Sequence, residues 1–136
     1  MSREIKFRAW LKSRWEDDED AEKMYYDVQN SYDNLGNVEP YDPMTSFEGW
    51  LIDDVADVEQ YTGLKDRHST EIYEGDVVLD YYDGEDAFIV EWDKDTASFI
   101  LVGTDHIASV SFDNFDADID LEVIGNIHEN PELLEN

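Results

Sequence analysis

Acidic side chains dominate the parts of this sequence where chemistry could be placed. The chain carries 36 Asp+Glu against 9 Lys+Arg, which gives a formal net charge of −27. Two clusters concentrate the acids, and the first of them also contains two tyrosines. The first cluster is Asp80, Tyr81, Tyr82, Asp83, Glu85 and Asp86, and the second is Asp113, Asp116, Asp118 and Asp120. Carboxylates attract basic groups, and a tyrosine beside an aspartate can grip an arginine. We therefore predict that these two clusters contact a protein partner.

The density of this charge indicates which kind of partner to expect. Duplex DNA carries one charge per ~1.7 Å of its axis, so 27 charges correspond to about 46 Å of duplex. A compact chain of 136 residues is only about 37 Å across. The protein thus matches the charge density of nucleic acid, and it would repel nucleic acid itself. A basic protein surface, above all one built to hold nucleic acid, is the expected partner.

Other kinds of chemistry find little support in the residue pattern. There are no cysteines, which excludes disulfides, thiolate metal sites and cysteine nucleophiles. The three histidines form no zinc-binding pair, and no serine-nucleophile motif or phosphate-binding glycine loop is present. The D-x-D-x-D run at 116–120 has Leu121 and Ile127 where a calcium loop needs Gly and Glu, so a solvated strand edge is favoured over weak calcium binding. We expect no catalytic residue, no metal and no cofactor, and hence no enzyme.

The elements that carry these residues are expected to be mostly strands. Short alternating segments bounded by turn residues predict strands near 5–12, 23–29, 59–64, 71–82, 87–93, 97–103, 108–112 and 120–128. Even spacing of such strands is typical of an antiparallel sheet that bends strongly or closes into a small barrel. The fold class predicted is therefore mostly β (α+β), in a single domain over residues 1–136. One helical turn is expected after Pro131.

One helix is predicted near 46–57. Thr45 and Glu48 form a capping box just before it. An apolar face follows at helical spacing, and we expect it to pack against the rest of the domain through Phe47, Trp50, Leu51 and Val55.

The first strand, 5–12, separates two kinds of side chain. Alternation places Ile5, Phe7, Ala9 and Leu11 on one face and Lys6, Arg8, Trp10 and Lys12 on the other. The second face would be solvated and rich in basic residues. Because residues 24–136 hold 29 of the 36 acids and only three of the nine bases, this strand should form a neutral strip on an acidic body.

Three segments together carry a family resemblance. They read REIKFRAW at 3–10, YTGLKDRHSTEIYEGDVV at 61–78 and EVIGNIHENPELL at 122–134. In this order and spacing they resemble the YopX family, small proteins encoded by phages and prophages of Gram-positive bacteria. The resemblance reaches the start, middle and end of the chain. It implies a mostly β fold and a viral accessory role, and it supplies no catalytic residues.

Several residues in these segments are expected to serve the scaffold. Gly63 and Gly75 can supply positive φ angles at turns, and Asp76 can accept hydrogen bonds from nearby backbone amides. Gly125, between Ile124 and Asn126, indicates a bulge or a bend in the sheet. Function is then left to the acidic surface and to the variable middle of the chain, 28–58.

The charge and the resemblance together predict a phage-encoded acidic accessory protein. It would bind and inhibit a host nucleic-acid-handling defence protein, of the CRISPR or restriction type, by nucleic-acid mimicry. The alternative is a non-inhibitory acidic binding or scaffold module of the phage, with an unknown protein partner. The chain has no long apolar run, so we expect neither a signal peptide nor membrane insertion, and a place in the cytoplasm of the bacterial host.

Overall fold

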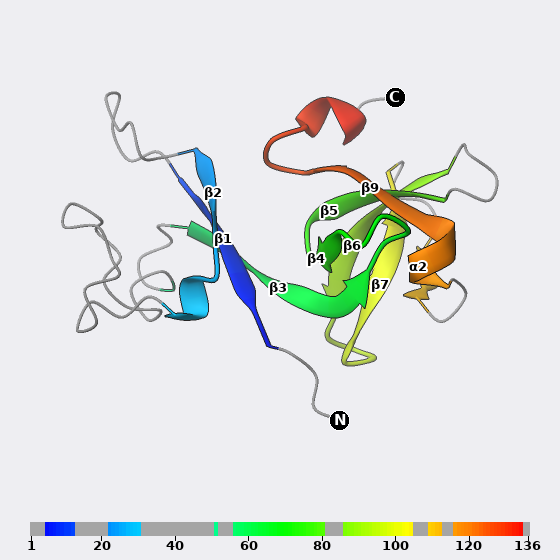
Figure 1. Cartoon of the computed structure of the whole chain (residues 1–136), viewed down its shortest axis with the longest axis horizontal. Helices are drawn as coiled ribbons and strands as arrows, with labels where there is room; N and C mark the ends of the chain where they lie inside the picture. The colour runs from blue at the N-terminus through cyan, green and yellow to red at the C-terminus, as the bar shows by residue number, and fades with distance from the viewer. Residues whose placement is uncertain are drawn as a thin grey trace. The chain divides into compact units, whose positions relative to one another are not determined.

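The computed structural model of the chain contains two compact units, Met1–Gln60 and Tyr61–Asn136 (Figure 1). The structure describes residues 5–12, 22–30, 51, 56–80, 86–104, 109–112 and 116–134. Within these ranges every paired strand runs antiparallel to its neighbour. This confirms the prediction of a mostly β fold.

Unit 1 is built on a three-stranded arrangement with β1 in the middle. Strand β1 (Phe7–Leu11) pairs with β2 (Lys23–Tyr26) on one side and with the start of β3 (Ala56–Lys65) on the other. The short 3-10 helix η1 (Val28–Asn30) follows β2, and Gln29 accepts a hydrogen bond from the Phe7 N–H at 2.8 Å. A small core forms from Ala9, Leu11, Val28 and Ala56.

Arg8 corrects the prediction of a solvated basic face on the first strand. Its side chain is buried, and its Nε donates a hydrogen bond to the Glu59 carboxylate at 2.9 Å. The two residues are direct cross-strand partners in the β1–β3 register. A buried charge is tolerated only when it is paired, and alternation along one strand cannot reveal a partner 51 residues away. Lys12 stays half-buried, beside Asp57 at 3.2 Å.

Unit 2 contains a five-stranded sheet that curls strongly (Figure 1), as predicted. The strand order is β8-β7-β6-β5-β9. The bounds are Asp76–Asp80 for β5, Ala87–Asp93 for β6, Ser98–Gly103 for β7, Ser109–Ser111 for β8 and Leu121–Asn126 for β9. The later residues of β3 pair with the short β4 (Glu71–Tyr73).

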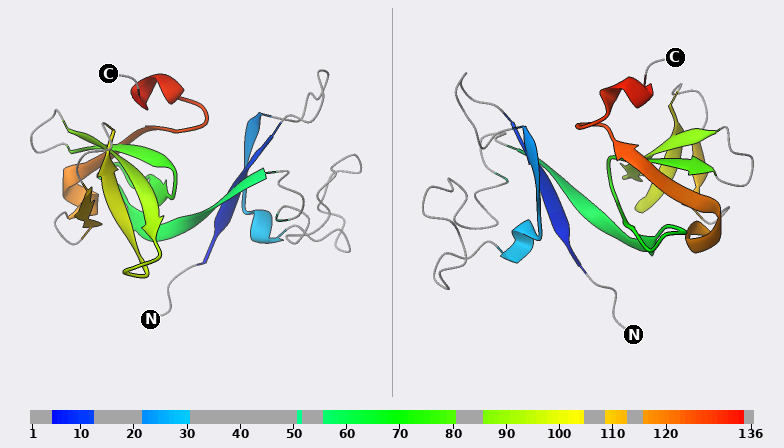
Figure 2. Two further views of the ribbon diagram at one scale, coloured as in Figure 1. Left: turned by 180° about the vertical axis from the view of Figure 1, so that it is seen from behind. Right: turned by 45° about the horizontal axis from the view of Figure 1, so that its top comes forward.

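Two short helical segments flank β9. Helix α2 (Ala117–Asp120) leads directly into the strand, and both views of Figure 2 show it at that end of β9. The 3-10 helix η4 (Pro131–Leu134) follows at the other end and confirms the predicted turn after Pro131. The core of unit 2 consists of Ile72, Val78, Phe88, Val90, Leu101, Phe112, Ala117 and Leu121.

The helix predicted near 46–57 lies largely outside the described residues. Leu51 is helical, but 57% of it is exposed, so its expected packing is wrong. Ala56 and Asp57 already belong to β3, so the helical pattern ends earlier than predicted. The strand begins there because Ala56 and Asp57 pair with Leu11 and Trp10 of β1, and this tertiary pairing overrides a local helical pattern.

The scaffold predictions for the glycines and Asp76 are confirmed. Gly63 and Gly75 have φ angles of 89° and 87°, in the region that favours glycine. The Asp76 carboxylate accepts the Tyr73 N–H at 2.7 Å and closes the turn between β4 and β5. At Gly125 the β5–β9 register shifts, which is the expected bulge.

Candidate acidic interface

Strand pairing brings the described members of the two predicted acidic clusters to one end of the unit 2 sheet. Asp80, the last residue of β5, pairs with Leu121, the first residue of β9, and α2 ends immediately before Leu121. The Asp80 N–H also donates to the Asp86 carbonyl at 2.8 Å, so Asp86 lies beside it. We call this surface the acidic end, and its described members are Asp80, Asp86, Asp116, Asp118 and Asp120.

The remaining predicted site residues cannot be placed on this surface. Tyr81, Tyr82, Asp83, Glu85 and Asp113 lie outside the described residues. Their role in binding stays a prediction, although Asp80 and Asp86 bracket the first four of them in the chain.

The D-x-D-x-D run forms α2 instead of the predicted strand edge. Asp116 is the residue before the helix, and its N–H donates to the Asp120 carboxylate at 3.0 Å. Ala117 is buried in the core, which fixes the turn to the sheet. Alternating acids suit a helical turn as well as a strand, and the buried Ala117 decides between them. Asp120 therefore has a structural role, while Asp116 and Asp118 are exposed.

The acids of α2 raise the pKa of Asp116. A side-chain hydrogen bond with Asp118, followed by repulsion from Asp118, by desolvation and by repulsion from Asp120, raises the pKa of Asp116. Nearby negative charge disfavours the ionised form of a carboxyl group. An approaching cation would relieve the same repulsion.

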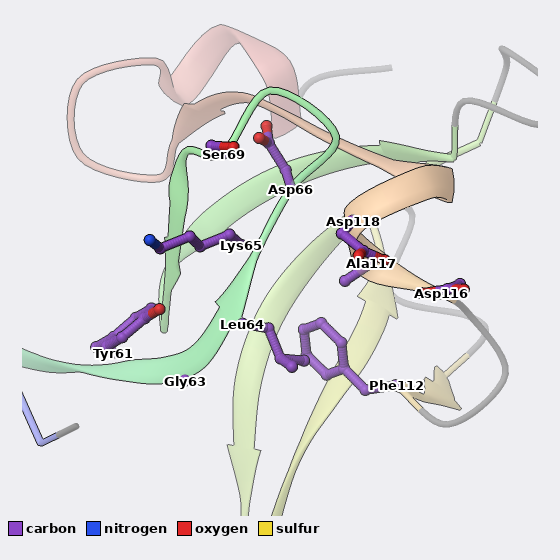
Figure 3. A pocket seen from close by; sticks show the side chains of 10 residues that line it. All are labelled: Tyr61, Gly63, Leu64, Lys65, Asp66, Ser69, Phe112, Asp116, Ala117 and Asp118. Atoms are coloured by element: carbon purple, nitrogen blue, oxygen red, sulfur yellow. The ribbon is translucent and has the colours of Figure 1, made fainter. Parts of the chain in front are cut away.

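A groove of about 720 Å³ opens next to α2. Its lining residues are Tyr61, Gly63, Leu64, Lys65, Asp66, Ser69, Phe112, Asp116, Ala117 and Asp118. Figure 3 shows Leu64 and Phe112 side by side in its middle, Asp116 and Asp118 on the α2 side, and Lys65 with Tyr61 on the opposite side. The groove thus joins the acidic end to an apolar patch.

Asp66 holds the turn that forms one wall of this groove. Its buried carboxylate accepts N–H groups from His68 at 2.8 Å, Thr70 at 2.9 Å and Val123 at 2.8 Å. Burial acts to raise the pKa of Asp66, but these three hydrogen bonds and the nearby charge of His68 outweigh it, and the pKa is lowered. The residue therefore stays ionised and fastens the turn at 66–70 to β9.

Sequence reasoning missed Asp66 among 36 acids. The available signal was an aspartate followed by four polar turn residues, which is typical of a side chain that accepts nearby backbone N–H groups. That pattern could have predicted the bonds to His68 and Thr70. The bond to Val123 spans 57 residues and leaves no local trace.

The side chains of the described residues limit the kinds of site that they can form. In the ranges that the structure covers, no group of three or more His, Cys, Asp or Glu side chains converges to hold a metal ion. No helix among the same residues is long and apolar enough to cross a membrane. The acidic end and its groove offer exposed carboxylates and apolar contact area, which together suit a basic protein surface.

Comparisons with known proteins agree with the fold. A family model described as YopX protein matches residues 6–135. Among solved structures, the crystal structure of protein EF1440 from Enterococcus faecalis is similar, with a TM-score of 0.53 and 23% identity over 98% of this chain and 100% of the other. At this identity the likeness concerns the fold alone. No curated protein matches the chain.

Proposed function

Because the chain belongs to the YopX family, we propose that it is a phage-encoded accessory protein that binds and inhibits a host nucleic-acid-handling defence protein. The family suggests a phage-type protein. The inhibition would be of the anti-CRISPR or anti-restriction type, and it would work by imitating nucleic acid.

The observation that carries this proposal is the acidic end. Asp80 and Asp86 of the first predicted cluster and the α2 acids of the second lie together there, because Asp80 of β5 pairs with Leu121 of β9. A surface that gathers carboxylates from separate segments on a chain of net charge −27 presents a concentrated negative field. A cleft built to hold phosphates offers the complementary positive field.

Two physical effects would act in sequence during binding. The negative field would steer the basic cleft toward the acidic end and speed association. A few buried contacts would then hold the complex, since exposed ion pairs are each worth only about 0.2–1 kcal/mol. The groove beside α2 supplies the apolar area for such contacts.

The proposal can be tested with a matched pair of charge-reversed proteins. One carries Asp86→Lys with Asp116→Lys, at the acidic end. The other carries Glu91→Lys with Asp95→Lys, which lie toward the β6–β7 turn at the far end of β6. All four side chains are exposed, and both variants change the net charge equally.

Each protein is immobilised and exposed to a bacterial lysate at low and high salt. The wild type and the far-end variant are expected to retain a nucleic-acid-binding protein at low salt and to release it at high salt, while the acidic-end variant loses it. Equal capture by both variants would contradict the proposal, because binding would then follow net charge and not this surface. Capture of a partner without nucleic-acid-binding activity would favour the non-inhibitory binding module instead.

A further inference from the structure

The groove beside α2 has two chemically different sides, and this asymmetry restricts what can occupy it. Leu64 and Phe112 lie in the middle, and Leu64 leaves 41% of its surface exposed. Asp116 and Asp118 stand on the α2 side (Figure 3). Exposed apolar area beside a pair of carboxylates fits a side chain that is apolar along its length and cationic at its tip.

The geometry of the acidic side favours a planar cation. Asp116 and Asp118 are two residues apart and both line the groove on its α2 side, so one group with several N–H donors can reach both carboxylates together. A guanidinium presents five donors in a rigid plane and stacks on apolar and aromatic surfaces, whereas an ammonium is a compact, strongly hydrated charge. Arginine therefore fits this side better than lysine.

The opposite side of the groove favours a residue within a chain over a free cation. Lys65 is exposed there, and Figure 3 shows its side chain directed away from α2. A ligand that spans the groove therefore meets carboxylates at one side and an ammonium at the other, whereas a metal ion or free guanidinium can match only the carboxylates. An arginine residue in a protein can place its guanidinium at the acids and a main-chain carbonyl oxygen toward Lys65.

We infer that this groove receives an arginine side chain of the bound protein. The inference rests on the proposed function, because it makes the groove the anchoring point of the acidic end. The guanidinium contacts Asp116 and Asp118, and the aliphatic part of the arginine lies over Leu64 and Phe112. Arginines that normally hold phosphates are abundant in clefts that bind nucleic acid, so such a partner offers suitable side chains.

The test uses small probes that report on the groove without any partner. Nα-acetyl-arginine amide is titrated into the isotopically labelled full-length protein, and the amide resonances of the lining residues are followed by NMR. Nα-acetyl-citrulline amide has nearly the same shape without the charge, and Nα-acetyl-lysine amide has the charge without the plane. The arginine probe is expected to shift resonances around Leu64, Phe112 and Ala117 in a saturable way, lysine more weakly and citrulline not at all.

Two variants locate the binding. Asp116→Asn with Asp118→Asn removes both charges while keeping side-chain size, and it should weaken the arginine probe by about two- to thirtyfold, as expected for the loss of two exposed ion pairs. Glu91→Gln with Asp95→Asn removes the same charge near the β6–β7 turn and should leave the affinity unchanged. Leu64→Ser, on a side chain that is already partly exposed, should weaken the probe without unfolding the protein.

Two results would overturn the inference. One is binding of arginine and lysine with equal affinity and with shifts spread over the whole surface, and the other is equal weakening by both charge-removing variants. The proposed function would survive these results if the partner were still captured through the acidic end. Conversely, saturable arginine binding in the groove combined with failure of partner capture would leave the groove's preference for arginine standing and remove the proposed function.

Discussion

The turn at 66–70 and helix α2 both contribute aspartates to the lining of one groove, yet the two regions use them in opposite ways. Asp66 is buried, accepts three backbone N–H groups, and has a lowered pKa. Asp116 is exposed, lies among the acids of α2, and has a raised pKa. The first carboxylate is satisfied by the fold, and the second gains from a cation that comes from outside.

This difference shows that a count of acids does not define a binding surface. The chain has 36 acidic residues, and some of them, including Asp66, Asp76 and Glu59, hold the scaffold together. The mimicry proposal depends on the other class, whose charges face solvent and repel one another. The predictions below separate the two classes, starting with the largest expected effect.

Replacing Asp66 should produce the largest loss of stability. Asp66→Ala removes the acceptor of three N–H groups, and a hydrogen bond to a charged group typically contributes about 1.5–3 kcal/mol. We expect the free energy of unfolding, measured with urea, to fall by at least about 3 kcal/mol. Asp118→Ala replaces an exposed acid of α2 and should change the free energy of unfolding by less than about 0.5 kcal/mol. Similar losses for the two variants would remove the distinction between scaffold and surface acids.

Gly125→Ala tests how tightly the scaffold closes after β9. A Cβ at this position would lie 2.5 Å from Asn130 Oδ1 and 2.9 Å from Leu133 Cδ1, so these two side chains must move. Overpacking of this kind typically costs about 1–3 kcal/mol, and the thermal unfolding midpoint should fall accordingly. The α2 surface should be unaffected, so binding of a basic partner should persist. An unchanged midpoint would show that the Asn130 and Leu133 side chains move aside at no cost in stability.

Salt should stabilise the protein near pH 7. Exposed acids on a chain of net charge −27 repel one another, and the Debye length shrinks from about 30 Å at 0.01 M to about 3 Å at 1 M salt. Thermal melts in increasing sodium chloride should therefore shift upward. A flat or falling midpoint would mean that nearby positive charges already offset the exposed acids. It would contradict the repulsion that we describe among the acids of α2.

The smallest effect should distinguish the two aspartates by the sign of their pH dependence. Asp66 has a lowered pKa, so its stabilisation is present above its ordinary value of 3.8 and is lost as the pH falls through its folded pKa. Asp116 has a raised pKa, so its ionisation disfavours the folded state as the pH rises through that value. Asp116→Asn should slightly raise the melting temperature at pH 7 and low salt, and the gain should vanish below pH 3.8. A lower melting temperature at pH 7 would contradict the repulsion at α2.

Local patterns in the sequence predict where strands and turns lie better than they predict which residues those elements contact. Alternation places β6 at Ala87–Asp93 as expected, and Gly75 with Asp76 marks the turn before β5. The burial of Arg8 could not be predicted, because it depends on Glu59 in a distant strand. Helix α2 was missed because its alternating acids resemble a strand and its deciding contact is the burial of Ala117.

The candidate site was predictable in its parts but not in its assembly. Charge alone singles out the acids at 80–86 and 113–120, and the β5–β9 register that places Asp80 opposite Leu121 emerges only in the fold. The groove has the same origin, since Leu64 and Phe112 come from segments 48 residues apart. Patterns of neighbouring residues therefore identify the charged clusters, but they cannot identify the apolar area that the fold places beside these clusters.

The most direct measurement is competition with nucleic acid. A host protein captured by the wild type is challenged with duplex DNA of increasing length, and its release is compared for the wild type and the Glu91→Lys/Asp95→Lys variant. Because the mimic and DNA would share one basic cleft, DNA should release the partner in proportion to its affinity for that cleft, equally from both proteins. If DNA at saturating concentration leaves the partner bound, the protein and nucleic acid occupy different sites, and nucleic-acid mimicry is wrong.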